Sequence, residues 1–198
     1  IAGGPNGAPG SYYPPYSNKN NQVIIEKSEN KYLTDLIMEK TLLFLDKVNA
    51  PFFLNYSPYA VHTPIQPVDS LIYKYENKPP YKGQKNPKYA TMVENLDRNI
   101  GLMVDKLKKR KLFDNTFVIF TSDNGGYYGK ITKQKPLRAG KGSYYEGGIR
   151  VPFFFMWKNK ISPGKNIQTP ISHLDIFPTL MHLTGDDIIK NNLDGYSL

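Results

Sequence analysis

Three short apolar runs alternate along this chain with segments of helical periodicity: "PFFLNYS" (51–57), "FVIF" (117–120) and "VPFFFMW" (151–157). Runs of this length, rich in aromatic and β-branched residues, are typical of buried strands, whereas a helix needs a longer pattern. Strands that are apolar along most of their length occur mainly in parallel sheets with helices on both faces. The sequence therefore predicts an α/β protein with a mainly parallel sheet flanked by helices.

The helical segments are recognised by apolar residues at the spacing i, i+3, i+4, i+7. This pattern extends from Tyr89 to Leu107. An earlier segment with helical spacing begins near Lys31 and ends at about Lys47. A shorter segment, "LDIFPTLMHLTG", has Pro178 near its first turn and Gly185 where a helix would stop. Together these segments predict three helices.

Long connections make up the rest of the sequence. Residues 1–30 are rich in Gly, Pro, Tyr and Asn and predict an irregular region. Residues 58–88 carry six prolines without a clear period, and residues 125–150 are rich in Gly and Lys. Because loops of that length are uncommon in compact domains unless they are functional, we expect both to serve a site.

The composition narrows the classes of partner. A formal net charge of +9 favours a polyanion: nucleic acid, a sulfated glycan or a membrane surface. However, the densest basic run, "KLKKRK" (106–111), falls in the last turns of a predicted helix, where cations interact favourably with the helix dipole. No signature of a common nucleic-acid-binding module is present, so no nucleic-acid partner is expected.

Two further absences in the sequence limit the possibilities. No apolar run approaches the roughly 20 residues that span a bilayer, so no membrane span is expected. The chain has no cysteine, which excludes disulfides and thiolate chemistry within it. It begins at Ile1 without an initiator Met, and we expect it to be a piece of a longer protein.

The stretch "TFVIFTSDNGG" (116–126) ends a predicted strand with a carboxylate and an amide, Asp123 and Asn124. Asp-Asn-Gly is a common turn sequence, but residues 127–150 separate it from the next apolar run, which weakens a tight hairpin. An Asp carboxylate beside an Asn carbonyl offers two hard oxygen ligands, suited to Ca²⁺ or Mg²⁺. A turn and half of a metal site both remain open from these residues alone.

Two other loop residues are candidates for chemistry. His62 follows the first apolar run and Lys141 lies between two glycines, although a loop histidine is more often hydrogen-bonded and a loop lysine more often solvated. In open α/β sheets ligands gather at the carboxyl ends of strands, which favours His62 together with the Asp-Asn pair. Glu146 and Arg150 are expected to pair with each other and hold the loop.

Four segments together resemble the sulfatase family of the alkaline phosphatase superfamily. They are "PFFLNYSPYAVHTPIQP", "YATMVENLDRNIGLMVDKLKKRKLFDNTFVIFTSDNGG", "LRAGKGSYYEGGIRVPFFFMW" and "ISHLDIFPTLMHLTG" with "LDGYSL", in family order and spacing. They cover nearly all of residues 32–198. The resemblance implies that residues 1–198 are the C-terminal part of a sulfatase catalytic domain, incomplete in this chain, with 58–88 and 125–150 as active-site loops.

The resemblance also implies roles for the candidate residues. Asp123 and Asn124 match the pair that ligates the divalent cation, usually Ca²⁺, with Mg²⁺ as the other candidate. His62 matches the histidine beside the leaving-group oxygen, and Lys141 matches the lysine that contacts the sulfate. The implied reaction is attack of a hydrated formylglycine on sulfur, release of the alcohol, and elimination of sulfate.

One departure from the family pattern is large. The formylglycine is made from the Cys or Ser that opens a Cys/Ser-x-Pro-x-Arg motif, and that motif is absent, since Ser162 leads only into "SPGK". We therefore expect the nucleophile and the other metal ligands in a missing N-terminal half, without which this chain is inactive. The expected substrate is a sulfated small molecule or sulfated glycan, and family resemblance suggests export to the periplasm, the lysosome or the outside.

Two other functions remain open at the level of sequence. A phosphoester or phosphonate hydrolase of the same superfamily can share the Asp-Asn pair and the histidine. A non-catalytic binder of sulfated glycans can keep the fold and the basic charge. The identity of the nucleophile discriminates among the three.

Overall fold

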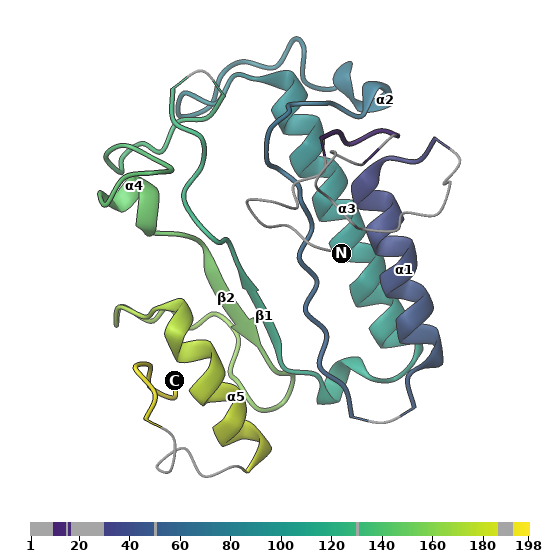
Figure 1. The fold of residues 1–198 in the computed structure, drawn as a ribbon, viewed down its shortest axis with the longest axis vertical. Helices are drawn as coiled ribbons and strands as arrows, with labels where there is room; N and C mark the ends of the chain where they lie inside the picture. Colours follow the sequence, from purple (N-terminus) through teal and green to yellow (C-terminus); the bar gives the residue numbers. More distant parts are fainter. Residues whose placement is uncertain (1–9, 15, 17–29, 50, 130, 186–191) are drawn as a thin grey trace. The chain divides into compact units, whose positions relative to one another are not determined.

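The structure is a computed structural model in which the described residues are 10–14, 16, 30–49, 51–129, 131–185 and 192–198. The chain divides into two compact units, residues 1–161 and 162–198. Figure 1 shows the elements, which in chain order are α1 (Leu33–Lys47), α2 (Asp69–Ile72), α3 (Pro87–Lys109), η1 (Phe113–Asn115), β1 (Val118–Thr121), α4 (Glu146–Ile149), β2 (Phe153–Met156), η2 (His173–Asp175) and α5 (Ile176–Thr184). No described helix combines the length and the apolar character needed to cross a membrane.

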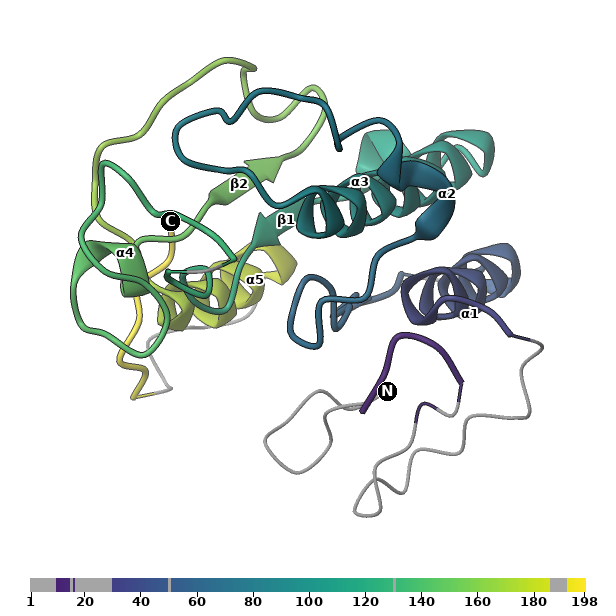
Figure 2. The ribbon, with the colours of Figure 1, turned by 90° about the horizontal axis from the view of Figure 1, so that it is seen from above.

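The two long helices of the first unit, α1 and α3, run side by side in the same direction (Figures 1 and 2). Both were predicted from apolar spacing. α3 begins where the sequence provides a start signal: the Asn86 side chain accepts a hydrogen bond from the backbone N–H of Tyr89 at 3.1 Å, and Pro87 occupies the first helical position. The connection between α1 and α3 includes residues 51–86 and contains the short helix α2.

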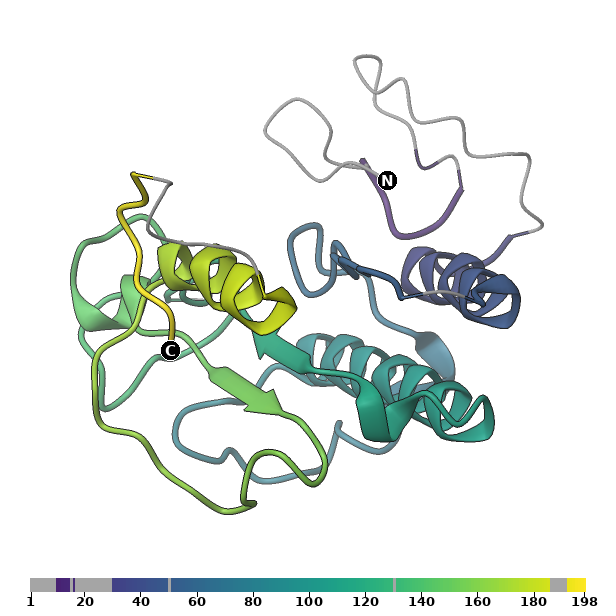
Figure 3. The ribbon, with the colours of Figure 1, turned by 90° about the horizontal axis from the view of Figure 1, so that it is seen from below.

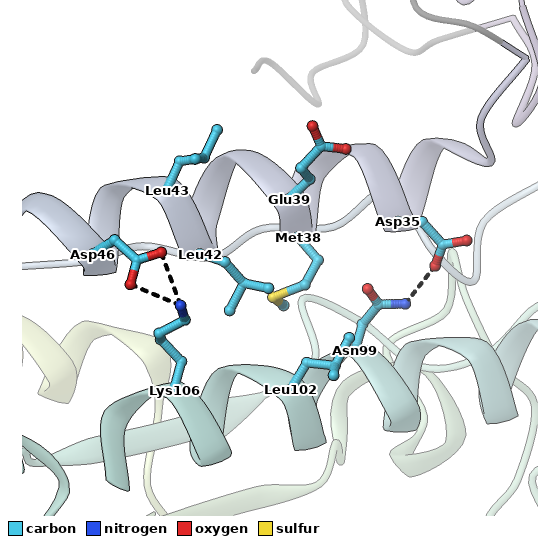
Figure 4. A pocket seen from close by; sticks show the side chains of 9 residues that line it. All are labelled: Asp35, Met38, Glu39, Leu42, Leu43, Asp46, Asn99, Leu102 and Lys106. Atoms are coloured by element: carbon cyan, nitrogen blue, oxygen red, sulfur yellow. Dashed lines mark hydrogen bonds and ion pairs between the residues drawn. The ribbon is translucent and has the colours of Figure 1, made fainter. Parts of the chain in front are cut away.

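Polar contacts clamp the two helices at both ends of their interface. The Asp35 carboxylate accepts hydrogen bonds from the buried amides of Asn95 and Asn99 at 2.9 and 2.7 Å. At the other end Lys106 pairs with Asp46 at 2.7 Å. Between the clamps lies a groove of about 390 Å³ whose lining includes none of the candidate site residues (Figure 4).

The basic run 106–111 serves this helix pair. Besides the Lys106 pair, the Arg110 guanidinium donates to the backbone carbonyls of Leu45 and Val48, both at 2.9 Å, at the end of α1. These carbonyls lack partners inside their own helix, so the contact satisfies them. The run is thus a helix end that caps its neighbour, and its predicted position in the last turns of a helix is confirmed.

The core of the first unit is rich in tyrosine. Tyr12, Tyr16 and Tyr32 are buried together with apolar residues of α1 and with Met92 of α3, and the rings of Tyr12 and Tyr32 stack with centroids 5.2 Å apart. Of the irregular region expected over 1–30, only residues 10–14, 16 and 30 are described; among these, Tyr12, Tyr13 and Tyr16 contribute to the core. The remainder lies outside the described residues.

The strands β1 and β2 form an antiparallel pair in which Val118 lies opposite Met156 and Thr121 opposite Phe153. The α/β class is confirmed, but within the described residues the only strand pair is antiparallel, whereas a mainly parallel sheet was expected. Parallel neighbours need a crossover of about a dozen residues, usually helical. Among the described residues of the connection from β1 to β2, the helical part is the four-residue α4. β2 lies antiparallel to β1, an arrangement that is common at the edge of mixed sheets.

Residues 51–57 were predicted to be a buried strand, and this prediction is wrong for the described structure. The segment does not form a strand, because no described residue makes backbone hydrogen bonds with it. Its side chains alternate between half-buried and exposed, and Phe53 is 76% exposed. Phe154 of β2 is likewise 64% exposed, so the expected cover on both faces is also not observed among the described residues.

The second unit centres on α5 (Figure 3). The Asp175 carboxylate accepts from the backbone N–H groups of Tyr196 at 2.9 Å and Ser172 at 2.7 Å, and these bonds lower the pKa of Asp175. Gly185 ends the helix in the left-handed region with φ 82°, and Pro178 lies in the first turn, both as predicted from the sequence.

Candidate active site

The Asp-Asn pair lies directly after β1. The Ser122 hydroxyl donates to the backbone carbonyl of Asn124 at 3.0 Å and closes a turn there. The Asn124 Nδ2 group donates to Asp123 Oδ2. Among the described residues, neither Asp123 Oδ1 nor the side-chain oxygen of Asn124 has a hydrogen-bond partner, so the pair presents two oxygens from the end of one strand.

The loop after the pair is held by close backbone packing between glycines. The Gly125 N–H donates to the Gly148 carbonyl at 2.8 Å, and the Gly147 N–H donates to the Arg138 carbonyl at 2.8 Å. A Cβ at Gly125 would lie 1.9 Å from the carbonyl oxygen of Gly147, which no side chain tolerates. Glycine here allows residues 138–148 to approach the end of β1.

The same backbone packing places Lys141 next to His62 and to the loop after Asn124. Its backbone N–H donates to the Gly126 carbonyl at 3.0 Å, two residues beyond Asn124. Its ammonium Nζ lies 2.9 Å from Nε2 of His62, a residue 79 positions away in the sequence. The structure therefore brings His62 and Lys141 into contact, and it ties Lys141 through the backbone to the loop that follows Asp123 and Asn124.

The other nitrogen of His62 shows how the ring is held. Nδ1 lies 2.9 Å from the Thr63 carbonyl oxygen and 2.9 Å from the Tyr59 hydroxyl, which itself donates to that carbonyl at 2.7 Å. A carbonyl only accepts, so these partners assign the proton of neutral His62 to Nδ1. Nε2 then carries the lone pair that accepts from the Lys141 ammonium. Partial burial raises the pKa of Tyr59, so its hydroxyl stays neutral and keeps this role.

A buried tyrosine, Tyr12, contacts the backbone of the loop that carries His62. Tyr12 is fully buried, and its hydroxyl lies 3.0 Å from the Tyr59 carbonyl and 2.9 Å from the His62 carbonyl. Burial is the main reason that the pKa of Tyr12 is raised far above its usual value. Neither Tyr12 nor Tyr59 was identified from the sequence; Tyr59 stands three positions before His62, but Tyr12 has no local signal because it is 50 positions away.

Tyr12→Phe should lower the free energy of unfolding by about 1 kcal/mol, because the ring stays packed while the His62 carbonyl loses a hydroxyl donor. Chemical denaturation of the two proteins measures this difference. Tyr81→Phe is the matched control, since Tyr81 is 71% exposed and should change stability by less than about 0.5 kcal/mol. Equal stability of Tyr12→Phe and the parent would show that the hydroxyl does not hold the loop.

Glu146 and Arg150 form the expected pair, with Arg150 Nη1 3.5 Å from Glu146 Oε2. Both side chains are well exposed, at 62% and 66%, so solvent screens the attraction and it contributes little to stability. The pair lies on and just after α4 and confirms the expected pairing, while a role in holding the loop stays a prediction.

The family resemblance implies a divalent cation, and the donor set at the end of β1 fits one. A carboxylate and an amide oxygen are the hard ligands that Ca²⁺ and Mg²⁺ prefer. Two such groups are only part of a coordination sphere. Among the described residues, no group of three or more His, Asp or Glu side chains gathers closely enough to hold a metal ion.

The chain matches the family model described as Sulfatase over residues 2–186. The protein named Sulfatase from Formosa agariphila is 35% identical over 202 residues, covering 93% of this chain and 36% of that protein. Human arylsulfatase H is 30% identical over 191 residues, covering 91% of this chain and 32% of that protein. The chain therefore spans about a third of the length of these curated relatives.

Solved structures agree with the sequence comparison. The crystal structure of Ps i-CgsB in complex with k-i-k-neocarrahexaose has a TM-score of 0.78 and 39% sequence identity, covering 88% of this chain and 39% of that one. The fold is thus the alkaline phosphatase-like α/β fold of sulfatases. Because the family model extends over nearly the whole chain and these relatives align along it, the chain belongs to the sulfatase family.

Proposed function

We propose that the intact protein hydrolyses sulfate esters and that this chain supplies part of its catalytic site. The observation that carries the proposal is the 2.9 Å contact between His62 Nε2 and Lys141 Nζ, beside a loop that begins with Asp123 and Asn124. Two long loops meet there to place an ammonium next to an imidazole. Both groups are exposed at this point, so an anionic substrate has access to them.

The proposed roles follow from the chemistry of each side chain. The Lys141 ammonium neutralises negative charge on the sulfuryl oxygens, which grows as the ester bond breaks. In the neutral ring Nε2 accepts from the Lys141 ammonium; when Nε2 is protonated this hydrogen bond is lost, and the Nε2–H donates its proton to the departing alkoxide. The hydrogen bond from Nδ1 to the Thr63 carbonyl supports this because it is present in both the neutral and the protonated ring.

Asp123 and Asn124 would hold the divalent cation, Ca²⁺ or Mg²⁺. When bound, the cation adds positive charge for the sulfuryl oxygens. We expect the remaining ligands and the formylglycine nucleophile in a part of the protein outside these 198 residues, because the motif that forms formylglycine is absent here. The isolated 198 residues should therefore be inactive and bind the metal weakly.

A sulfated glycan is the proposed substrate class. The proposal is supported by the neighbour crystallised with k-i-k-neocarrahexaose, an oligosaccharide, at 39% identity. The net charge of +9 also suits a polyanionic substrate. Export to the periplasm, the lysosome or the outside stays a prediction from family resemblance.

The test combines peptide mass mapping with kinetics on the intact source protein. We expect a Cys or Ser converted to formylglycine, and a kcat/KM for 4-nitrophenyl sulfate at least about 100-fold above that for 4-nitrophenyl phosphate. A preference for the phosphate ester would instead assign a phosphoester hydrolase of the same superfamily. Glycan binding without turnover, and with no modifiable residue, would assign a non-catalytic binder.

A further inference from the structure

Two turns near the candidate site are fastened to each other. In the first, Tyr81 and Gln84 exchange backbone hydrogen bonds at 3.1 and 2.9 Å. The Gln84 side chain then bridges to the second turn: its Nε2 donates to the Lys133 carbonyl, and its Oε1 accepts from the Lys133 N–H at 3.3 Å. The second turn closes through Thr132, whose N–H donates to the Tyr127 carbonyl at 3.2 Å. Both turns are therefore internally closed and held together.

This pair of turns exposes aromatic faces with a cation over each. Tyr81 is 71% exposed and Tyr128 is 55% exposed. The Lys82 ammonium lies 5.3 Å from the Tyr81 ring centroid, and the Lys133 ammonium lies 5.6 Å from the Tyr128 ring centroid. Cation–π contacts at exposed sites are weak, so an anion readily competes for these lysines. We call Tyr81, Lys82, Tyr128 and Lys133 the tyrosine–lysine rim.

The charge around the rim has one sign. Residues 78–88 contain four lysines, and residues 125–145 contain four lysines and one arginine; neither range contains Asp or Glu. Within the part of the chain that the structure describes, no ion pair engages Lys82 or Lys133. The positive charge is thus left for a partner from outside these loops.

The rim adjoins the candidate active site through Tyr128. A Cβ at Gly140 would lie only 2.6 Å from the Cβ of Tyr128, so the tyrosine backbone packs directly on that glycine. Lys141 is the next residue, with its ammonium on His62. A chain-like substrate whose sulfate reaches Lys141 would extend over Tyr128.

We propose that the tyrosine–lysine rim is a subsite for a sulfated glycan chain, in which tyrosine faces stack on sugar rings and Lys82 and Lys133 bind sulfate groups that are not hydrolysed. This inference rests on the proposed function and deepens it, because it selects polysulfated oligosaccharides over small aryl sulfates. Flat sugar faces and regularly placed sulfates match alternating aromatic and cationic groups. Nucleic acid, which also combines rings with anions, is the competing ligand in the test.

The experiment measures Kd by calorimetry on the intact protein carrying His62→Ala, so that the ligand is not turned over. The probes are sulfated hexasaccharides from carrageenan, chondroitin sulfate and heparin. Tyr128→Leu keeps the Cβ packing against Gly140 but removes the ring, and it should raise the Kd of the best-bound hexasaccharide about tenfold, as should Lys133→Ala. Tyr128→Phe keeps the ring and should stay within about twofold.

Lys108→Ala is the matched charge control. Lys108 also lies over an aromatic ring, that of Phe113 at 5.3 Å, but at the end of α3 and outside the rim. This variant should stay within about twofold of the parent. Unchanged affinity of both Tyr128→Leu and Lys133→Ala would overturn the subsite, as would no binding of any hexasaccharide or tighter binding of a single-stranded oligonucleotide.

The outcomes separate the subsite from the proposed function. If the parent protein hydrolyses no sulfate ester but glycan binding weakens in the rim variants, the subsite stands and the hydrolase assignment falls. If the parent hydrolyses 4-nitrophenyl sulfate and both rim variants bind glycan like the parent, the hydrolase assignment stands and the subsite falls.

Discussion

Asp123→Ala in the intact protein should lose bound divalent metal and sulfate ester hydrolysis together. The carboxylate is one of two oxygen groups that this chain offers to the cation, and Asn124 is oriented by a hydrogen bond to it. Removing the carboxylate takes away a charged ligand and frees its neighbour to rotate. We expect at least about a 100-fold loss of kcat/KM, the size typical for removal of one electrostatic stabiliser.

Elemental analysis of purified Asp123→Ala measures its bound divalent metal, and kinetics with 4-nitrophenyl sulfate measure its kcat/KM. Asp114→Ala is the matched control, because Asp114 is an exposed carboxylate just before β1 that pairs with Lys158 at 2.8 Å. It should keep its metal and stay within about threefold of the parent rate. If Asp123→Ala keeps both metal and activity, the Asp-Asn-Gly stretch is only a turn.

His62→Ala should slow hydrolysis most for esters whose alcohol is a poor leaving group. Such an alkoxide needs a proton as it departs, whereas an activated phenolate leaves without one. For an alkyl or sugar sulfate we expect a loss of about 100- to 10,000-fold in kcat, and for 4-nitrophenyl sulfate a loss at least about tenfold smaller.

The control for this variant is His182→Ala. His182 is a histidine of α5 whose Nδ1 lies 2.8 Å from the Ser197 hydroxyl, within the second unit. Its removal should leave the dependence on leaving group unchanged. An equal loss for sugar sulfates and for the activated aryl sulfate in His62→Ala would show that the imidazole acts on substrate binding and not on the leaving group.

The three longer helices, α1, α3 and α5, could be predicted closely from the sequence because their signals are local, whereas the four-residue helices α2 and α4 fall in segments predicted as loops. The apolar spacing from Tyr89 to Leu107 predicts α3 to within two residues at each end. Gly185 predicts the end of α5, since a left-handed residue there suits glycine. Family membership also follows from local motifs, which occur in the expected order along the chain.

Strand pairing could not be predicted from the same signals. Apolar composition identified 117–121 and 151–157 as strands but carries no information about direction, and the pair is antiparallel. Residues 51–57 have a comparable composition, yet without a described partner for their backbone they are extended and unpaired. A strand exists only when a second segment accepts its hydrogen bonds, and that is a tertiary property.

For the candidate site, the sequence by itself determined the residue types: an Asp-Asn pair after a strand, a loop histidine and a lysine between glycines. Only the tertiary structure decided that Lys141 Nζ lies 2.9 Å from His62 Nε2 and that the Tyr59 hydroxyl contacts the His62 ring. It also decided that the buried Tyr12 contacts the backbone of the His62 loop. The reason is that periodicity and turn chemistry act over a few residues, whereas these contacts depend on the packing of loops and core residues that are far apart in the sequence.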